Sequence, residues 1–262
     1  MIPQASPDDP RVLEYGHVGD HAWLSERHLF VAEGRLLLER LFAAGTFRIV
    51  SVLVTPPAAA ALAGPLGRVQ ADVLVVDPAV LKGVTGFDFH RGCLALVERP
   101  RALTLDDLPA QGCVVGLEGV GNPDNVGGLF RTAAAFDVAA MILDRTTGDP
   151  FYRKALRTSM GAALRLPFVR VPGWVGTIRR LREDGWIVAA LTPSHDADPL
   201  DGAACDLASS PRRVLLAGSE GAGLSPETLA IADYRLRIPI ASDVDSLNVT
   251  VAAGIALARL SR

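Results

Sequence analysis

The sequence predicts an α/β protein whose sheet is mostly parallel and carries helices on both faces. Short apolar runs that suit strands alternate with helix-like segments along most of the 262 residues. Several of these runs, such as residues 186–192, are apolar almost throughout, which is typical of strands buried on both faces of a parallel sheet. The composition is that of a folded globular protein, because 49% of the residues are hydrophobic and 21% are charged.

The first hundred residues have the pattern of a compact α/β unit. Residues 35–45 show an amphipathic helical pattern that ends at Gly45, and Pro56 ends the strand pattern that follows. We expect strands at 29–34, 48–56, 71–78 and 92–100, and helices at 35–45, 58–64 and 78–86.

A polar, proline-punctuated stretch at residues 99–112 marks a domain boundary. We therefore expect a smaller N-terminal α/β domain at 1–103, a linker at 104–112 and a C-terminal domain at 113–262. In the C-terminal domain we expect strands at 113–120, 139–144, 166–172, 186–192, 213–218 and 234–240, and helices at 125–136, 150–163, 176–185 and 246–260. Since ligands bind beyond the carboxyl ends of parallel strands, the loops after 114–117, 214–218 and 236–240 are the places to search for a site.

The net charge of −3 hides one basic segment. No acidic residue occurs between Pro150 and Leu181, whereas eight basic residues lie in this window or just after it: Arg153, Lys154, Arg157, Arg165, Arg170, Arg179, Arg180 and Arg182. Taken alone, the pattern favours a solvated helical face over a phosphate-binding surface.

Three widely spaced cysteines, Cys93, Cys113 and Cys205, form no CxxC or His/Cys cluster. We therefore expect no disulfide framework and no metal site, and the cytoplasm as the location. The polar, acidic residues 1–16 do not resemble a signal peptide, and no apolar run reaches membrane-spanning length, so we expect no membrane partner.

Each of the three loops has an ordinary structural interpretation. Residues 215–227 are rich in glycine but match neither GxGxxG nor GxxxxGK(S/T), the two nucleotide-loop patterns. A simple glycine-rich turn is therefore the alternative interpretation. Ser246 or Asn248 can simply cap the last helix. Arg131 can form an ion pair with a neighbouring acid. A cap or a turn does not explain why all three loops place polar residues beside glycine at strand ends.

Residues 113–262 resemble the SpoU (TrmH-like) branch of the SPOUT RNA methyltransferases. The resemblance rests on three motifs in the family's order. They are Asn125-x-Gly127-x-x-x-Arg131-Thr132, Gly218-x-Glu220-x-x-Gly223-Leu224-Ser225, and Ile238-Pro239 followed by Ser246-Leu247-Asn248-Val249-Thr250. One departure is Asp137, where the family often has glycine. Residues 20–100 look like the ribosomal-protein-like RNA-binding domain often fused ahead of this catalytic domain.

The resemblance implies a C-terminal α/β knot, in which the chain is threaded into a deep trefoil. It also implies a homodimer through the C-terminal domain, with each site completed by the partner chain. The implied cofactor is S-adenosyl-L-methionine, and the implied reaction is methyl transfer to a ribose 2′-hydroxyl of rRNA or tRNA. By analogy, the N-terminal domain favours rRNA. No metal is implied.

The resemblance assigns catalytic roles to five residues. Arg131 is expected at the 2′-oxygen, where its guanidinium, always protonated in proteins, stabilises developing negative charge. Asn125 and Glu220 are expected to orient Arg131. Ser246 and Asn248 are expected to fix the target ribose and phosphate.

Cofactor and RNA contacts follow by the same resemblance. The main chain at Gly218, Ile238 and Leu247 matches the family's cofactor positions, and we add Leu216 and Ala217 of the same strand. The expected RNA contacts are Arg157 and Ser159 in the basic segment and, on charge beside expected strand ends alone, Arg27 and Arg91.

Two other functions compete with this prediction. A knotted module that binds RNA but no longer methylates it would be indicated by loss of motif residues, and all are present. A dinucleotide-dependent oxidoreductase would need a glycine fingerprint after its first strand, which the sequence lacks.

Overall fold

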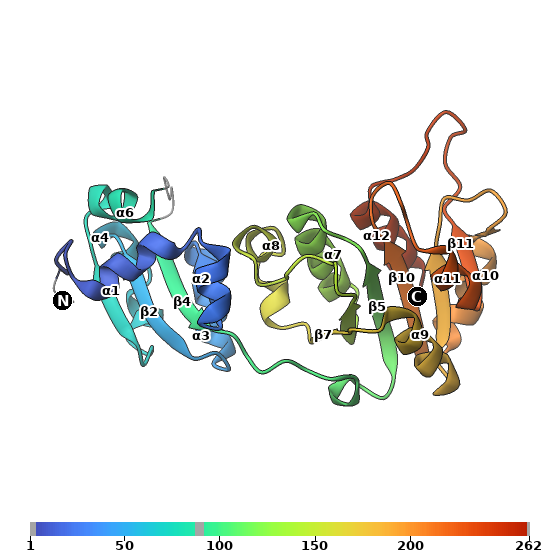
Figure 1. Ribbon diagram of the computed structural model, residues 1–262, viewed down its shortest axis with the longest axis horizontal. Coiled ribbons are helices and arrows are strands. Elements are labelled where there is room, and N and C mark those ends of the chain that lie inside the picture. The colour runs from blue at the N-terminus through green and yellow to red at the C-terminus, as the bar shows by residue number, and fades with distance from the viewer. Residues whose placement is uncertain (1–3, 87–91, 261–262) are drawn as a thin grey trace. The chain divides into compact units, whose positions relative to one another are not determined.

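A computed structural model describes residues 4–86 and 92–260. The chain divides into two compact units: unit 1 comprises residues 1–101 and 151–164, and unit 2 comprises residues 102–150 and 165–262. Figure 1 shows the elements of both units. No helix in the part of the chain that the structure describes is long and apolar enough to cross a membrane.

Unit 1 is built on a four-stranded sheet in the order β1-β4-β2-β3. Strand β4 runs antiparallel to β1 and β2, whereas β2 and β3 are parallel. The strands are β1 (Leu29–Glu33), β2 (Ile49–Val54), β3 (Asp72–Val75) and β4 (Cys93–Glu98). The helices are α1 (Pro10–Leu13), η1 (Glu14–His17), α2 (His21–Glu26), α3 (Arg35–Ala44), α4 (Pro56–Ala61), α5 (Ala63–Leu66), α6 (Pro78–Thr85), α8 (Arg153–Thr158) and η3 (Ala162–Leu164).

The core of unit 1 has a polar interaction at its centre. Tyr15 is fully buried against Val31, Leu53 and other aliphatic residues, and its hydroxyl lies 2.9 Å from Ser51 Oγ. Burial raises the pKa of the Tyr15 phenol well above its ordinary value. The hydroxyl pair therefore satisfies two groups that would otherwise be costly to bury.

Residues 151–164 fold with unit 1, although we predicted them inside the C-terminal domain 113–262. The reason is an aromatic contact: the Phe151 ring stacks on Phe30 at 4.7 Å and 17°. Arg40 donates to the main-chain oxygen of Met160. Gly161 has φ +79°, a backbone conformation that favours glycine, and a Cβ there would lie 2.9 Å from Leu37 Cδ1, so the Leu37 side chain would also have to shift.

Unit 2 contains a seven-stranded sheet in the order β7-β6-β5-β10-β8-β11-β9, in which all neighbours are parallel. This confirms the predicted α/β class with a parallel sheet. The strands are β5 (Gly112–Glu118), β6 (Ala140–Leu143), β7 (Phe168–Arg170), β8 (Ile187–Leu191), β9 (Asp198–Pro199), β10 (Arg212–Gly218) and β11 (Tyr234–Arg237). The helices are η2 (Leu105–Asp107), α7 (Pro123–Ala135), α9 (Trp174–Glu183), α10 (Leu200–Ser209), α11 (Pro226–Ile231) and α12 (Val249–Leu260). The implied trefoil knot stays a prediction.

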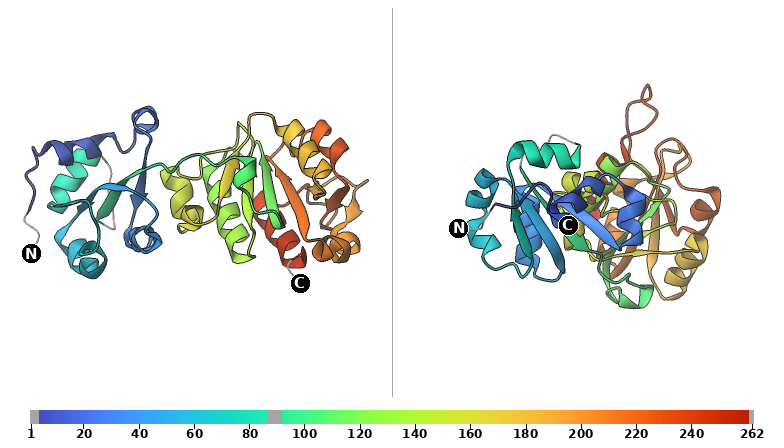
Figure 2. Two further views of the ribbon diagram at one scale, coloured as in Figure 1. Left: turned by 90° about the horizontal axis from the view of Figure 1, so that it is seen from below. Right: turned by 60° about the vertical axis from the view of Figure 1, so that its left-hand side comes forward.

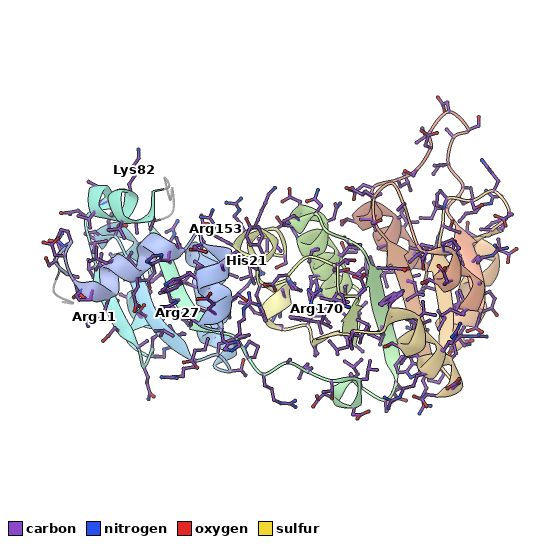
Figure 3. The ribbon with its side chains drawn as sticks, viewed as in Figure 1. Arg11, His21, Arg27, Lys82, Arg153 and Arg170 are labelled. Atoms are coloured by element: carbon purple, nitrogen blue, oxygen red, sulfur yellow. The ribbon has the colours of Figure 1, made fainter. Side chains whose placement is uncertain are left out.

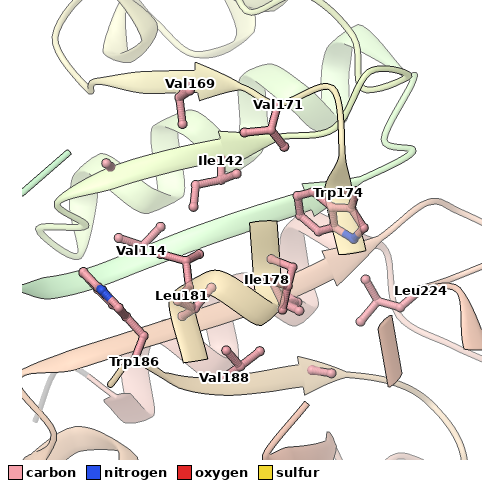
Figure 4. Packing of buried hydrophobic residues seen from close by; sticks show 14 residues of the cluster. Val114, Ile142, Val169, Val171, Trp174, Ile178, Leu181, Trp186, Val188 and Leu224 are labelled. Carbon is pink, nitrogen blue, oxygen red and sulfur yellow. The ribbon is translucent and has the colours of Figure 1, made fainter. Parts of the chain in front are cut away.

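Helices cover both faces of this sheet, with α7 and α12 on one face and α9 on the other (Figure 2). The core under α9 contains Trp174, Ile178 and Leu181, which pack on sheet residues such as Val114 and Leu216 (Figure 4). The strands β5, β10 and β8 are central, and they carry their loops to one edge of the sheet.

Residues 104–112, which we predicted as a linker, group with unit 2 in the structure. Leu105 and Leu108 pack against the core of unit 2, and η2 is held by a capping box between Thr104 and Asp107. In the sequence, only Leu105 and Leu108, three residues apart, indicate this packing, and the residues around them are mostly polar.

We predict that Phe151→Ala destabilises unit 1 by about 3–5 kcal/mol, because it removes a buried ring that stacks on Phe30. Denaturant unfolding measures this loss, and amide hydrogen exchange in residues 152–164 should become faster. The neighbouring Tyr152 is 41% exposed, so Tyr152→Ala should change stability by no more than about 0.5 kcal/mol. Equal effects of the two changes would show that Phe151 does not hold the segment.

Candidate functional site

The candidate site lies where β5 and β10 end side by side. The parallel ladder between them runs to Gly218 opposite Glu118, so the loops that follow both strands are neighbours. A Cβ on Gly119 would lie 3.5 Å from Ser219 Cβ. The loop after β5 leads into α7, whose first turn is capped by Asn122: its side chain accepts from the Asp124 N–H at 2.9 Å, and Pro123 follows.

Three motif residues meet at this edge through one side-chain amide. Asn248 Nδ2 donates to Asn125 Oδ1 at 3.0 Å and to Glu220 Oε1 at 2.9 Å. Asn248 Oδ1 accepts from the Thr250 N–H at 2.9 Å, at the start of α12. Asn125 is only 6% exposed, so its amide oxygen needs this donor. We call these three residues the Asn125–Glu220–Asn248 cluster.

The adjacent glycines of the first motif let α12 approach α7 closely. A Cβ on Gly128 would lie 2.9 Å from both Thr250 Cγ2 and Thr250 Oγ1. Gly127 is buried within the same helix. A larger residue at position 128 would push α12 away, and with it the Asn248 side chain.

Arg131 lies apart from the cluster. It is exposed on α7 and forms no hydrogen bond or ion pair within the residues that the structure describes. That Asn125 and Glu220 orient Arg131 stays a prediction; among the described residues, both side chains accept from Asn248. In a helix of 3.6 residues per turn, residues six apart differ by about 240°, so Asn125 and Arg131 point to different faces.

The second motif forms a tight loop that only glycine permits at its start. A Cβ on Gly218 would lie 2.1 Å from the Gly223 carbonyl carbon, a main-chain atom that cannot move aside. The Gly223 N–H donates to the Ser219 oxygen at 3.0 Å and closes the loop. Sequence reasoning missed Glu118, whose Oε2 accepts from the Ser225 N–H at 3.2 Å and holds the far end of the loop. Its signal was an acid at the end of an apolar strand.

The expected cofactor residues fall into two groups. Leu216 and Ala217 are buried in β10, so only their main chain could reach a ligand. The ladder from β10 to β8 ends at Leu216, whereas the ladder to β5 continues to Gly218. The main chain at Ala217 and Gly218 therefore extends past the last β8 pair on that side. Ile238 and Leu247 are half-buried, as apolar walls for a flat ring would be.

The expected RNA contacts are spread over different environments. Ser246 is exposed in the loop before α12. Ser159 is 1% exposed and its hydroxyl donates to the Leu156 oxygen, so the structure does not offer it to a phosphate. The Arg157 side chain is 56% exposed, and its Nη1 lies 3.9 Å from a carboxylate oxygen of Glu33. Arg91 lies outside the described residues.

Several arginines of the basic segment form hydrogen bonds or ion pairs with groups of the unit to which they belong. Arg170 donates to the main-chain oxygens of Asp144, Thr147 and Gly148 at 2.7, 2.7 and 3.1 Å, and so shapes the loop after β6 (labelled in Figure 3). Arg180 pairs with an oxygen of Asp106 at 3.0 Å, and Arg182 with Asp233. These arginines do not form a free phosphate-binding surface.

The loop that Arg170 shapes also contains a stabilised carboxylate. Burial would raise the pKa of the Asp144 carboxyl, but hydrogen bonds from Thr146 and Thr147 outweigh burial and hold the pKa below its usual range. Asp144 therefore stays ionised and fixes the loop beside Gly119.

We predict that Asn248→Asp lowers the free energy of unfolding of unit 2 by about 1–3 kcal/mol, because a carboxylate gives Asn125 and Glu220 no donor. Denaturant unfolding measures the effect. The same exchange at Asn122 is the control: there the side chain only accepts, and Asp caps a helix as well as Asn, so stability should change by no more than about 0.5 kcal/mol. Equal losses would contradict a bridging role for the Asn248 amide.

Comparison with known proteins places this geometry in a family. Residues 112–258 match the model of the SpoU rRNA Methylase family, a range that contains all three motifs. A relative from Mycobacterium bovis, named as an uncharacterized tRNA/rRNA methyltransferase, is 34% identical over 261 residues, which are 98% of this chain and 90% of the relative. The 23S rRNA (guanosine-2′-O-)-methyltransferase of Vibrio cholerae is 35% identical over 178 residues, 64% of this chain and 68% of that protein.

Solved structures agree over both units. The AdoMet-bound rRNA methyltransferase from Sinorhizobium meliloti has a TM-score of 0.80 and 29% identity, and covers 98% of this chain and 95% of its own. The SpoU methyltransferase AviRb from Streptomyces viridochromogenes, at 23% identity and a TM-score of 0.77, shares the fold over 97% of both chains. The chain therefore belongs to the SpoU rRNA methylase family, a family of RNA methyltransferases.

Proposed function

We propose that this chain transfers a methyl group from S-adenosyl-L-methionine to a ribose 2′-hydroxyl of RNA. The observation that carries the proposal is the Asn125–Glu220–Asn248 cluster, in which one residue of each motif meets at the carboxyl ends of parallel strands. That is the edge where ligands bind in open α/β sheets. The Vibrio cholerae relative is named for a 2′-O-methylation, and the Sinorhizobium meliloti enzyme was solved with AdoMet.

The residues at the strand ends fit this cofactor. When bound, it supplies a methyl group on a sulfonium, which needs no further activation. The ladder between β10 and β8 ends at Leu216, before Ala217 and Gly218. The main-chain N–H and C=O groups of these two residues would form hydrogen bonds with the edge of the adenine. Ile238 and Leu247 would cover its faces, and an apolar wall keeps water out of the site. Glu118 keeps the second-motif loop in place by accepting from Ser225.

Arg131 would act on the RNA. A guanidinium is always protonated in proteins, so Arg131 would donate to the 2′-oxygen or the adjacent phosphate and stabilise the negative charge that develops there. Within the described part of the chain, no side chain forms a hydrogen bond or an ion pair with the Arg131 guanidinium. The exposed Ser246 hydroxyl, two residues before Asn248, would hold the ribose or phosphate. Positioning of the two reactants is then the main source of rate.

We also propose ribosomal RNA as the preferred substrate and the cytoplasm as the location. The relatives' names include both rRNA and tRNA. The Sinorhizobium meliloti structure that matches both units is an rRNA methyltransferase, which favours rRNA. Arg157 and Arg27 in unit 1 remain the proposed RNA contacts among the described residues.

A homodimer through α12 completes this proposal. Val251 and Ile255 are 50% and 37% exposed and lie four residues apart, on one face of α12. The other face of α12 packs on α7. A second copy would cover the apolar stripe, and it would bring other charged groups to Arg131, which has no partner among the described residues of its own chain.

We predict that Arg131→Ala lowers methyl transfer about 10²- to 10³-fold, because it removes a charged donor from the transition state. Counts from tritiated cofactor in 2′-O-methyl nucleosides of total RNA measure transfer. Cofactor binding, measured as a thermal shift with S-adenosylhomocysteine, should be unchanged. Arg179→Ala, at another exposed arginine of unit 2, is the control. Near-normal transfer by Arg131→Lys would argue against a specific role for the guanidinium.

We predict that Val251→Arg weakens self-association at least about tenfold, a cost of about 1.4 kcal/mol, because it places a charge in the α12 stripe. Light scattering during gel filtration measures the mass across a dilution series. Leu13→Arg is the matched control, since Leu13 in unit 1 is 51% exposed. A wild-type protein that is monomeric at every concentration, or equal effects of the two changes, would contradict the proposed interface.

A further inference from the structure

A chain of hydrogen bonds connects the core under α9 to the end of the second-motif loop, residues 218–225. The Trp174 indole N–H donates to the Thr228 hydroxyl oxygen at 3.0 Å. The hydroxyl oxygens of Thr228 and Ser225 lie 2.8 Å apart, and the Ser225 N–H donates to Glu118 Oε2 at 3.2 Å. Trp174 begins α9, Glu118 ends β5, and the two hydroxyls lie at the start of α11, so the chain joins three separate elements.

Burial decides which way the protons in this chain point. Trp174 is 9% exposed and Thr228 is fully buried, so the indole N–H and the Thr228 hydroxyl both need partners. Thr228 Oγ1 already accepts from the indole, and among the described residues Ser225 Oγ is the acceptor within reach of the Thr228 proton. The Thr228 hydroxyl is therefore assigned as the donor to Ser225. The Ser225 oxygen also accepts from the Thr228 N–H and so caps α11.

The anchored end of the loop lies against the strand that is expected to bind the cofactor. Leu224, next to Ser225, is 5% exposed and belongs to the same hydrophobic cluster as Trp174 (Figure 4). A Cβ on Gly218 would lie 2.3 Å from the Leu224 main-chain nitrogen, so the backbone at Leu224 packs against the end of β10. A shift of Ser225 would therefore move the main chain that packs on Gly218.

The middle of the loop depends on its two ends. Glu220 is exposed and lies between the end of β10 and the anchor at Ser225. The Gly223 N–H closes the loop by donating to the Ser219 oxygen at 3.0 Å. Glu220 accepts from Asn248 in the site, so the position of this carboxylate follows from where the loop ends are held.

We infer that Trp174 is a positioning residue: through Thr228 and Ser225, its indole N–H holds the second-motif loop in the form to which S-adenosyl-L-methionine binds. The inference rests on the proposed function and adds a residue that lies outside all three motifs. Trp174 acts on the cofactor only through the loop. A loop that is already ordered loses less conformational freedom when a ligand binds, so the affinity is higher.

Trp186 provides a matched control for Trp174. It is 8% exposed and packs in the same hydrophobic cluster, where Figure 4 shows the two rings at opposite sides. Its indole N–H forms no hydrogen bond within the described residues. A change of either tryptophan to phenylalanine removes the same ring volume from one core, but only Trp174→Phe breaks the hydrogen-bond chain.

Amide hydrogen exchange of the unliganded protein tests the anchoring of the loop. The Gly223 and Ser225 amides are hydrogen-bonded at the closed end of the loop. Trp174→Phe should make their exchange about threefold to tenfold faster, because the loop end loses one link of its anchor. Trp186→Phe should leave both rates unchanged. Thermal unfolding compares the stability of the two variants, and equal exchange rates in variants of equal stability would overturn the inference.

The affinity for S-adenosylhomocysteine, measured by titration calorimetry, tests the link to the cofactor. Trp174→Phe should weaken binding about threefold to tenfold, and Trp186→Phe less than about twofold. Thr228→Val leaves the indole N–H without an acceptor and should weaken binding at least as much as Trp174→Phe. Thr228→Ser keeps the hydroxyl and should bind as the unchanged protein does. Equal affinities of the valine and serine variants would contradict transmission through this hydroxyl.

The two measurements separate this inference from the proposed reaction. Faster exchange in Trp174→Phe, in a protein that does not bind S-adenosylhomocysteine, would support the anchoring of the loop by Trp174 and count against the proposed function. Normal methyl transfer by all variants, with equal exchange rates and equal affinities for S-adenosylhomocysteine, would leave the reaction standing and overturn the inference.

Discussion

The structure of the site depends on one amide group. The Asn248 side chain is the donor for two acceptors from different loops and the acceptor for the first turn of α12. No other residue of its size supplies two N–H donors and a carbonyl oxygen in one plane. The position of the last helix, the second-motif loop and the buried Asn125 are therefore linked, and a disturbance of any one reaches the other two.

Two glycines at the site, Gly128 beside the first motif and Gly218 in the second, act through contact distance. Gly128 and Gly218 both have ordinary backbone angles, and a Cβ on either would collide with a neighbouring element. Gly128 allows α12 to lie against α7, and Gly218 allows the main chain at Gly223 and Leu224 to lie against the end of β10. The Asn125–Glu220–Asn248 cluster forms because these two approaches bring side chains from distant parts of the sequence within hydrogen-bond reach.

Periodicity predicted the α/β class and every described strand except the two-residue β9, because those features depend on local pattern, and the resemblance of the motifs supplied the residues of the cluster. The partners of those residues were not predictable. We expected Asn125 to orient Arg131, yet a helix turns the two side chains to different faces, and only the fold shows that Asn248 donates to both Asn125 and Glu220. The contacts of Arg170 were not predictable for a related reason. A charged residue in the sequence does not reveal that main-chain carbonyls from another loop will accept its hydrogen bonds.

The grouping of residues 151–164 with unit 1 limits which parts of this chain can be exchanged independently. The chain passes between the units at three places, near residues 101, 150 and 164. Phe151 lies within the span of the family model, yet its stacking partner Phe30 lies far outside it. An exchange of residues 1–101 alone would replace Phe30 and keep Phe151. The ring at position 151 and its stacking partner at position 30 therefore have to suit each other, although only Phe151 lies within the span of the family model.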